Sequence, residues 1–366
     1  MSRRAYTLVE LLVVIVIGAI LVGIAVPSFQ ALLASSRESL AQNGLQQAIY
    51  SARDMATRNL GGGDAAAVFF YDRNRGLTVG VYEQVGSIDD DSSNSDSDTA
   101  QRDVFVPIAG MEAVGLPPGY AVRGFVLGTQ LRDEDWYEEL TEYNPPSGTL
   151  QPGGGSDRGP GAWVFPETDF YDQTAQDDGA DRQTFMIRFE AGTGALSRVN
   201  TSALVLDPRL SGENRDVFAG TSLEPVNQAE DLRSWAVRAA VSRDPAVLAA
   251  ITEILGNESS DTVLARAVTD IALYRERRMA QMLGLRGLNR QTDTIYEPGD
   301  EPEIDSALFR DATLASDRVA LETRITQWIE GRLAIEDNDA AGTAAEADSA
   351  IYTISAYFGD LVEVNR

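Results

Sequence analysis

An uninterrupted apolar segment near the N-terminus constrains this chain more than any other feature. From Leu11 to Ala34 the sequence has 24 residues and no charge. A helix rises about 1.5 Å per residue, so this segment extends roughly 36 Å, whereas a bilayer core is about 30 Å thick. We therefore predict a membrane-spanning helix that continues beyond the bilayer, because polar but still helical sequence follows it.

A specific pattern precedes this segment. It consists of a basic pair, a small residue, an aromatic residue and Thr-Leu-hydrophobic-Glu, carried by Arg3, Arg4, Ala5, Tyr6, Thr7, Leu8, Val9 and Glu10. The pattern resembles the N-terminus of type IV pilins and type II secretion pseudopilins. The resemblance implies cleavage by prepilin peptidase between Ala5 and Tyr6 and N-methylation of Tyr6. Ala5 stands where the family usually has glycine.

The same resemblance assigns roles within the helix. Glu10 becomes the fifth mature residue and Pro27 the twenty-second, both at the family's positions. A carboxylate buried in a membrane is costly unless it is paired. The resemblance implies that Glu10 pairs with the new α-amine of Tyr6 on a neighbouring subunit. Proline removes a backbone donor and clashes with the preceding turn, so we predict a kink at Pro27.

Two other interpretations of this segment exist. A secretory signal peptide also has a basic start and an apolar core, but no Ala-x-Ala cleavage site follows here and Glu10 lies inside the core. Thr7-x-x-Glu10 is also a capping box that would start a helix, which is compatible with the role in assembly.

Composition excludes several kinds of chemistry. The chain has 366 residues, a formal charge of −26, and neither Cys nor His, and all of its 30 basic residues are Arg. Without His and Cys there is no Ser-His-Asp or Cys-His catalysis. Without Lys there is no Walker A phosphate loop and no Schiff base. We predict no enzymatic activity, no catalytic residue and no cofactor. Such an acidic surface repels phosphate groups, and we therefore predict no nucleic-acid partner. The acid excess fits salt adaptation and the Arg bias fits a GC-rich genome.

The hydrophobic pattern predicts an α+β fold. We divide the chain into a leader (1–5), a transmembrane and filament-core helix (6–60), a β-rich head (61–225) and a helical C-terminal extension (226–366). In the helix, Leu45, Ala48, Ile49, Ala52 and Met55 share one face that should pack on the head.

The head should contain a small antiparallel sheet. Its predicted strands are Ala66–Tyr71, Leu77–Glu83, Val104–Ile108, Tyr120–Leu127, Ala162–Phe165, Thr184–Glu190 and Ala203–Leu206. The acidic segment 87–103 and the Pro/Gly-rich segment 143–161 are predicted loops.

Three phrases strengthen the family interpretation. They are SARDMATRN (51–59), LPPGYAVR (116–123) and FMIRFEAGTGALSR (185–198). Together with the order of one long helix and then short strands, they resemble the H-type minor pseudopilin of type II secretion. This second resemblance covers roughly residues 6–210.

The last third should be helical. Predicted helices are 232–241, one after Asp244-Pro245 that ends at Gly256, one from Asp261, and 306–333. In the third, Leu264, Ala267, Val268, Ile271 and Tyr274 share a face. In the fourth, Leu321, Ile325, Trp328 and Ile329 point inward.

Two charged segments suggest binding. Asp337-x-Asp339 to Asp348 is close to an EF-hand loop, but its fifth position is Ala and its twelfth is Asp, so we predict a solvated acidic loop and no metal site. Residues 266–290 carry six Arg against Asp270 and Glu276. These arginines either form internal salt bridges or dock an acidic neighbour through Arg275, Arg278 and Arg286, on a compact C-terminal lobe.

We therefore predict a structural minor pseudopilin of a type II secretion pseudopilus. It would be a single-pass protein of the bacterial inner membrane with an extracytoplasmic head. Implied partners are other pilins or pseudopilins, prepilin peptidase, the inner-membrane assembly platform and the lipid bilayer. The alternatives are a minor pilin of an adhesion, motility or DNA-uptake pilus, or a binding module on a plain signal anchor.

Overall fold

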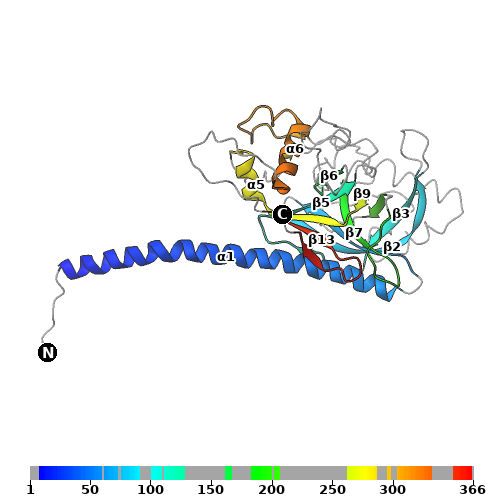
Figure 1. Cartoon of the computed structure of the whole chain (residues 1–366), viewed down its shortest axis with the longest axis horizontal. Helices are drawn as coiled ribbons and strands as arrows, with labels where there is room; N and C mark the ends of the chain where they lie inside the picture. Colours follow the sequence, from blue (N-terminus) through cyan, green and yellow to red (C-terminus); the bar gives the residue numbers. More distant parts are fainter. Residues whose placement is uncertain are drawn as a thin grey trace, which may run out of the picture. The chain divides into compact units, whose positions relative to one another are not determined.

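The described residues form one long helix followed by a strand-rich region, with the short helices α5 and α6 in the last third of the chain (Figure 1). It divides into two compact units, Met1–Asn43 and Gly44–Arg366. We describe it from a computed structural model that covers residues 8–59, 62–72, 76–90, 100–108, 111–127, 161–166, 183–199, 202–206, 262–286, 295–297, 303–331 and 349–364.

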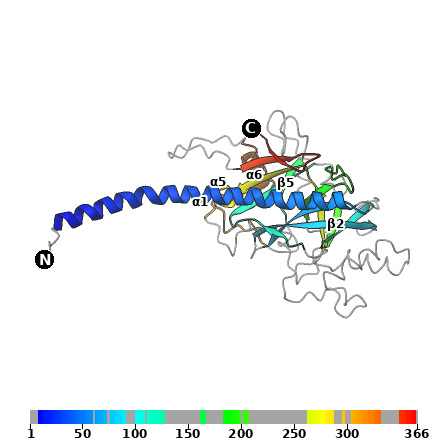
Figure 2. The ribbon, with the colours of Figure 1, turned by 90° about the horizontal axis from the view of Figure 1, so that it is seen from below.

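Helix α1 spans Leu8–Arg58, so the predicted long helix is confirmed and ends two residues earlier than expected. Its last part, residues 44–58, belongs to the second unit and covers the strands seen behind it in Figure 2. The predicted inward face is confirmed in its main part, because Leu45, Ala48, Ile49 and Ala52 are fully buried.

The first unit consists of the helical residues of α1 up to Asn43. Many of its large apolar side chains are exposed, including Ile15, Leu21, Phe29 and Leu32. Within the described part of the chain, no helix combines the length and the apolar character that crossing a membrane requires.

The larger sheet of the second unit closes on itself. Its strands pair in the order β1-β7-β9-β8-β3-β2-β4, and β1 also pairs with β2, so six of them form a closed barrel. The bounds are β1 Ala65–Asp72, β2 Gly76–Asp90, β3 Ala100–Pro107, β4 Val114–Gly115, β7 Gln183–Phe189, β8 Ala203–Leu206 and β9 Thr262–Ala267. The prediction of a small antiparallel sheet was wrong in two respects: the sheet is closed, and the pairs β3–β8 and β7–β9 are parallel.

Alternate residues of the six strands fill the barrel. β1 contributes Ala66, Val68 and Phe70, and the other strands contribute Tyr82, Phe105, Met186, Ala203, Val205, Val263 and Ala265. Successive side chains of a strand point to opposite faces, so residues two apart share the interior. Small residues on β1, β8 and β9 leave room for the Phe70, Tyr82 and Phe105 rings.

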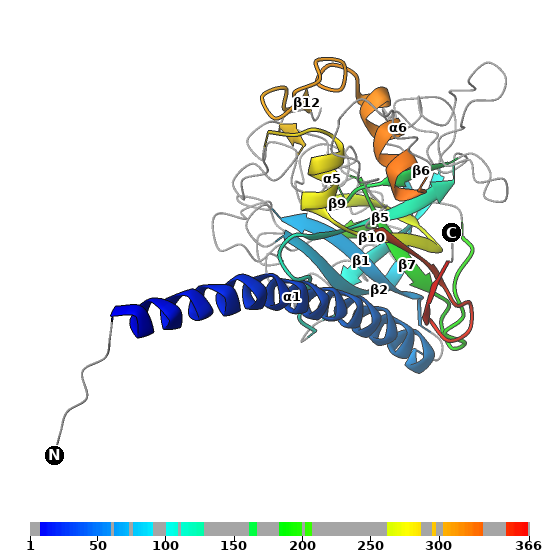
Figure 3. The ribbon, with the colours of Figure 1, turned by 60° about the vertical axis from the view of Figure 1, so that its left-hand side comes forward.

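A second sheet has the strand order β14-β13-β10-β5-β6. Its bounds are β5 Tyr120–Leu127, β6 Gly161–Val164, β10 Asp270–Arg275, β13 Ser349–Ile354 and β14 Leu361–Glu363. Helix α6, Arg318–Ile329, packs its buried Leu321, Ile325, Trp328 and Ile329 into a core with this sheet, and Figure 3 shows α6 beside β6. Helix α5, Glu276–Met282, follows β10 directly, and β11 Tyr296–Glu297 pairs with β12 Glu303–Ile304.

The two sheets approach closely at one glycine. A Cβ on Gly124 of β5 would lie 2.5 Å from the Phe185 ring of β7. That ring stacks on Phe69 of β1, with ring centroids 4.4 Å apart. The missing side chain at Gly124 therefore lets the barrel and the second sheet share one packed interface.

The predicted helical C-terminal extension was wrong. The described residues after 226 contribute two helices and six strands, and β9 inserts between β7 and β8 of the barrel while β10 and β13 lie in the middle of the second sheet. The helix predicted from Asp261 is replaced by β9 and β10. Both strands are buried on both faces, so their apolar residues need not alternate and the pattern of a strand is hidden. The predicted helix near 306–333 is confirmed as the shorter α6. The predicted helices at 232–241 and 245–256 lie outside the described residues.

The acidic segment 87–103 was predicted to be a loop, and its ends are strands instead. Ser87 pairs with Asp103 and Asp90 with Ala100, so β2 and β3 continue their hairpin into this segment. Residues 91–99 lie outside the described residues. The pairing of β2 with β3 therefore continues past Ile88 to Asp90, although the acidic composition of this segment does not predict a strand.

Candidate functional site

The predicted processing and assembly residues fall at the start of α1. Ala5 and Tyr6 lie outside the described residues, while Glu10 and Pro27 belong to the helical span of α1. Their proposed roles therefore remain predictions. The candidate site that the described residues form lies at the other end of this helix. There, residues 44–58 and Asp64, which precedes β1, meet the barrel.

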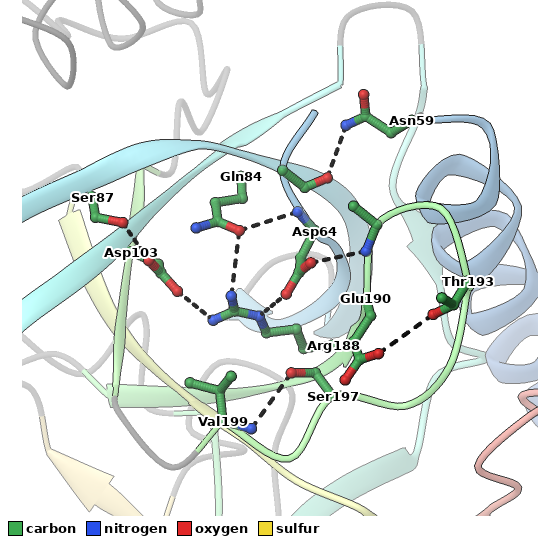
Figure 4. A network of polar contacts seen from close by, with 12 residues as sticks. Asn59, Asp64, Gln84, Ser87, Asp103, Arg188, Glu190, Thr193, Ser197 and Val199 are labelled. Atoms are coloured by element: carbon green, nitrogen blue, oxygen red, sulfur yellow. Dashed lines mark hydrogen bonds and ion pairs between the residues drawn. The ribbon is translucent and has the colours of Figure 1, made fainter. Parts of the chain in front are cut away.

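A buried arginine holds this connection to the barrel (Figure 4). Arg188 of β7 is only 4% exposed, and its Nε donates to Asp64 Oδ2 at 2.7 Å. A second ion pair joins its Nη1 to Asp103 Oδ2 of β3 at 2.7 Å. Its Nη2 donates to Gln84 Oε1 at 3.3 Å, and its guanidinium lies over the Phe105 ring. One side chain thus links three strands with the residue that precedes β1.

Asp64 is the centre of this network because it also makes hydrogen bonds to Ala191 and Gln84. Its Oδ1 accepts from the backbone N–H of Ala191 at 2.9 Å, and its own N–H donates to Gln84 Oε1 at 3.1 Å. Asn59, just after α1, donates its side-chain amide to the carbonyl of Gly63 at 2.8 Å. Hydrogen bonds of Asn59, Gly63 and Asp64 therefore hold the described residues between α1 and β1.

The turn after β7 docks on the last turns of α1. The Gly192 N–H donates to the Ala56 carbonyl at 2.8 Å. Gly192 and Gly194 have φ of 76° and 61°, a conformation that glycine adopts without steric cost. A Cβ at Gly194 would lie 2.4 Å from Thr57 Cγ2. Two of the phrases that resemble the H-type pseudopilin, residues 51–59 and 185–198, are therefore in direct contact.

A second turn, between β13 and β14, holds α1 from the C-terminal end of the chain. Gln46 donates to the Gly359 carbonyl and accepts from the Leu361 N–H, each at 3.0 Å. Arg53 Nε donates to the Tyr357 carbonyl at 3.0 Å, and the Tyr50 hydroxyl donates to the Asp360 carboxylate. This hydrogen bond to Asp360 is the main reason that the pKa of Tyr50 is raised.

A second buried ion pair fastens α6 to the second sheet. Arg123 of β5 and Glu322 of α6 are each 1% exposed, and Arg123 Nη1 lies 2.5 Å from Glu322 Oε2. Arg123 also donates to the Trp163 carbonyl at 2.9 Å and to the Tyr274 hydroxyl at 3.4 Å. Burial, opposed in part by Arg123, raises the pKa of Tyr274 to about 12.

The sequence analysis did not identify either network, although a signal was present. Arg188 and Arg123 each stand inside an apolar strand, in FMIRFE and YAVRGFVL. A buried charge is stable only when it is paired, so each of these arginines should have predicted an acidic partner. The partners could not be chosen from sequence, because Asp64 is 124 residues from Arg188 and Glu322 is 199 residues from Arg123.

The described arginines among the six of residues 266–290 do not form one surface, and Arg290 lies outside the described residues. Arg266 lies buried on β9, and Arg275 is half-buried with its guanidinium 5.9 Å from the Tyr120 ring centroid. Arg277, Arg278 and Arg286 are exposed on or just after α5. The predicted separate lobe was also wrong, because β10 and α5 belong to the second sheet and its core.

Metal binding is not indicated in the part of the chain that the structure describes. No group of three or more acidic residues there is arranged to hold an ion. The segment from Asp337 to Asp348, which is close to an EF-hand loop in sequence, lies outside the described residues.

Comparison with known proteins gives one match. A family described as the prokaryotic N-terminal methylation motif matches residues 1–26. No curated protein matches the chain, and no solved structure does so either. The motif supports a type IV pilin-like or pseudopilin-like protein, and it implies processing by prepilin peptidase and assembly with other pilins.

Proposed function

We propose that this chain is a structural, membrane-anchored minor pseudopilin that assembles into a type II secretion pseudopilus. The methylation motif at residues 1–26 is the observation that carries the proposal. Support for the H-type subclass comes from the contact between the phrases at 51–59 and 185–198, through Ala56 and Gly192. We also propose that the protein is not an enzyme, because the chain lacks His, Cys and Lys.

The proposed mechanism is mechanical. The charge-free segment from Leu11 to Ala34 holds the subunit in the inner membrane before assembly, with the β-rich region outside the cytoplasm. In the filament, Glu10 pairs with the Tyr6 amine of a neighbour. The Arg188 network and the two turns on residues 44–58 then transmit force from the helix to the barrel, because hydrogen bonds and ion pairs resist displacement along the helix axis.

A substitution at Glu10 tests the assembly role. Glu10→Val removes a charge that is costly in the membrane, so insertion should persist while co-purification with other pilin-like subunits falls. Glu10→Asp is the matched control, because it keeps the carboxylate and should retain part of the association. Unchanged co-purification of the Val variant would remove Glu10 from the assembly mechanism or place the subunit at the filament tip, where no neighbour lies above it.

A minor pilin of an adhesion, motility or DNA-uptake pilus would share the same motif. The gene neighbourhood separates the two proposals. A secretion ATPase, an outer-membrane secretin and other pseudopilins support the secretion role, whereas a retraction ATPase supports a pilus. Deletion of the gene should accordingly block export of secreted proteins rather than surface piliation.

A further inference from the structure

The turn between β13 and β14 presents two adjacent aromatic side chains to solvent. We call residues 355–360, Ser-Ala-Tyr-Phe-Gly-Asp, the aromatic turn. Tyr357 is 73% exposed and Phe358 66% exposed, more than the other large apolar side chains described in the second unit. Val362 of β14 and Tyr50 of α1 are 52% and 43% exposed. Adjacent aromatic residues exposed to this extent are typical of protein contact sites.

The backbone of the aromatic turn is held in place from three sides. Within the turn, the Ser355 N–H donates to the Asp360 carbonyl at 2.9 Å and the Gly359 N–H to the Ser355 carbonyl at 3.0 Å. The Leu196 N–H donates to the Ala356 carbonyl at 2.7 Å, which joins the turn to the segment after β7. Gln46 and Arg53 bind it to α1. The rings are therefore presented on a fixed backbone, so a partner would bind them without ordering a flexible loop first.

An acid and a cation lie together at the aromatic turn. The chain carries a net charge of −26, so two such subunits repel each other over most of their surfaces. The aromatic turn contains one acid, Asp360, and its carboxylate already accepts the Tyr50 hydroxyl. The nearby Asp54 of α1 is paired with Arg58 at 2.7 Å. The Asp360 carboxylate keeps its charge, because the phenol that donates to it is neutral, but Arg53 places a cation at the same turn, where its Nε donates to the Tyr357 carbonyl.

We propose that the aromatic turn is the contact that the head makes with the next pilin-like subunit of the filament. This inference rests on the proposed function. The turn is hydrogen-bonded to α1, and the motif at the N-terminal end of this helix implies assembly with other pilins. A subunit that packs along residues 46–53 of α1 meets Tyr357 and Phe358 next to that helix. The two rings are the anchors of this contact, and the uncharged backbone around them sets its geometry.

Site-specific photo-crosslinking of the full-length chain tests this proposal. In cells with the chain's own assembly genes, the crosslinking residue p-benzoylphenylalanine replaces Tyr357 or Phe358 in turn. The control position is Thr313, which is exposed on the loop before α6. Mass spectrometry of the adducts identifies the captured protein, and the same sample gives the mature N-terminus. We expect adducts with a pilin-like subunit from positions 357 and 358 and none from position 313.

The outcomes separate the two proposals. If the chain is processed to Tyr6 but positions 357 and 358 capture nothing, capture a protein that is not pilin-like, or behave like position 313, the aromatic turn is not the contact and the proposed function stands. If the chain is not processed at Tyr6, both proposals fail. As a second measurement, Tyr357→Ser with Phe358→Ser should lower co-purification with the partner at least about tenfold while the circular dichroism spectrum is unchanged. Unchanged co-purification would contradict the proposal.

Discussion

At the scale of single residues, the attachment of α1 depends on positions where no side chain fits. Gly194 has a φ of 61°, and a Cβ there would meet Thr57 Cγ2 at 2.4 Å. The Thr57 side chain cannot easily move away, because its hydroxyl donates to the Asp54 carbonyl at 2.8 Å. Backbone conformation and packing against the helix therefore both require glycine at this position.

Gly194→Ala should consequently destabilise the protein through two effects. The left-handed conformation costs an alanine about 1–2 kcal/mol, and the contact with Thr57 adds about 1–3 kcal/mol of overpacking. Gly284→Ala is the matched control, since Gly284 has a φ of 69° but open space around its Cβ position. Urea unfolding of the detergent-solubilised full chain measures both losses. Equal losses for the two variants would mean that the turn does not press on α1.

Tyr274 gives the protein a specific sensitivity to alkaline pH. Its pKa is raised from 10.0 to about 12 by burial. Because the folded state favours the protonated phenol, the stability is complete below pH 10 and is lost as the pH rises towards 12. The free energy of unfolding should fall by up to about 1.4 kcal/mol per pH unit in this window. Tyr274→Phe should lose less stability than the wild type between pH 10 and 12, and parallel curves would contradict this assignment.

At the scale of elements, the Arg188 network joins β3 and β7 to the residue that precedes β1. Arg188→Met keeps an unbranched apolar side chain but removes the guanidinium that lies over Phe105 and leaves Asp64 and Asp103 without their cation. Removing one partner of a buried ion pair costs about 3–5 kcal/mol. We expect about 3 kcal/mol, because Asp64 and Asp103 keep 17% and 18% of their side-chain exposure.

The control for this prediction is another arginine of the same region. Arg58 pairs with Asp54 at 2.7 Å, but the two side chains are 72% and 52% exposed. An exposed pair contributes about 0–1 kcal/mol, so Arg58→Met should change the free energy of unfolding little. Comparable losses for Arg58→Met and Arg188→Met in urea would show that the buried network does not anchor the helix.

The elements also show where sequence patterns predict structure and where they do not. The face of α1 that contains Leu45 and Ile49 could be predicted, because one side of the helix is buried and its apolar residues follow the helical period. Thr262–Ala267 was predicted to be a helix because burial on both faces removes the alternation of a strand. Barrel closure depends on pairings between distant segments, such as β7 with β9, which no local pattern encodes.

At the scale of the whole molecule, the strong negative charge makes three exposed arginines on and just after α5 a candidate docking surface. Arg277, Arg278 and Arg286 replace the originally predicted set, since Arg275 stacks on Tyr120. We propose that they orient an acidic neighbour, an effect that weakens as salt rises. Changing the three to Glu should leave the circular dichroism spectrum unchanged and reduce co-purification of partner subunits. Loss of folding would instead identify them as part of an internal network.

The mass of the mature N-terminus decides whether the chain is a pilin-like subunit. Mass spectrometry of the protein isolated from its own membrane should give an N-methylated Tyr6 as the first residue, with the apolar segment from Leu11 to Ala34 still attached. Such a product requires cleavage before the helix, which prepilin processing implies. A mature protein that begins after residue 25, or one that retains Met1, would contradict the account.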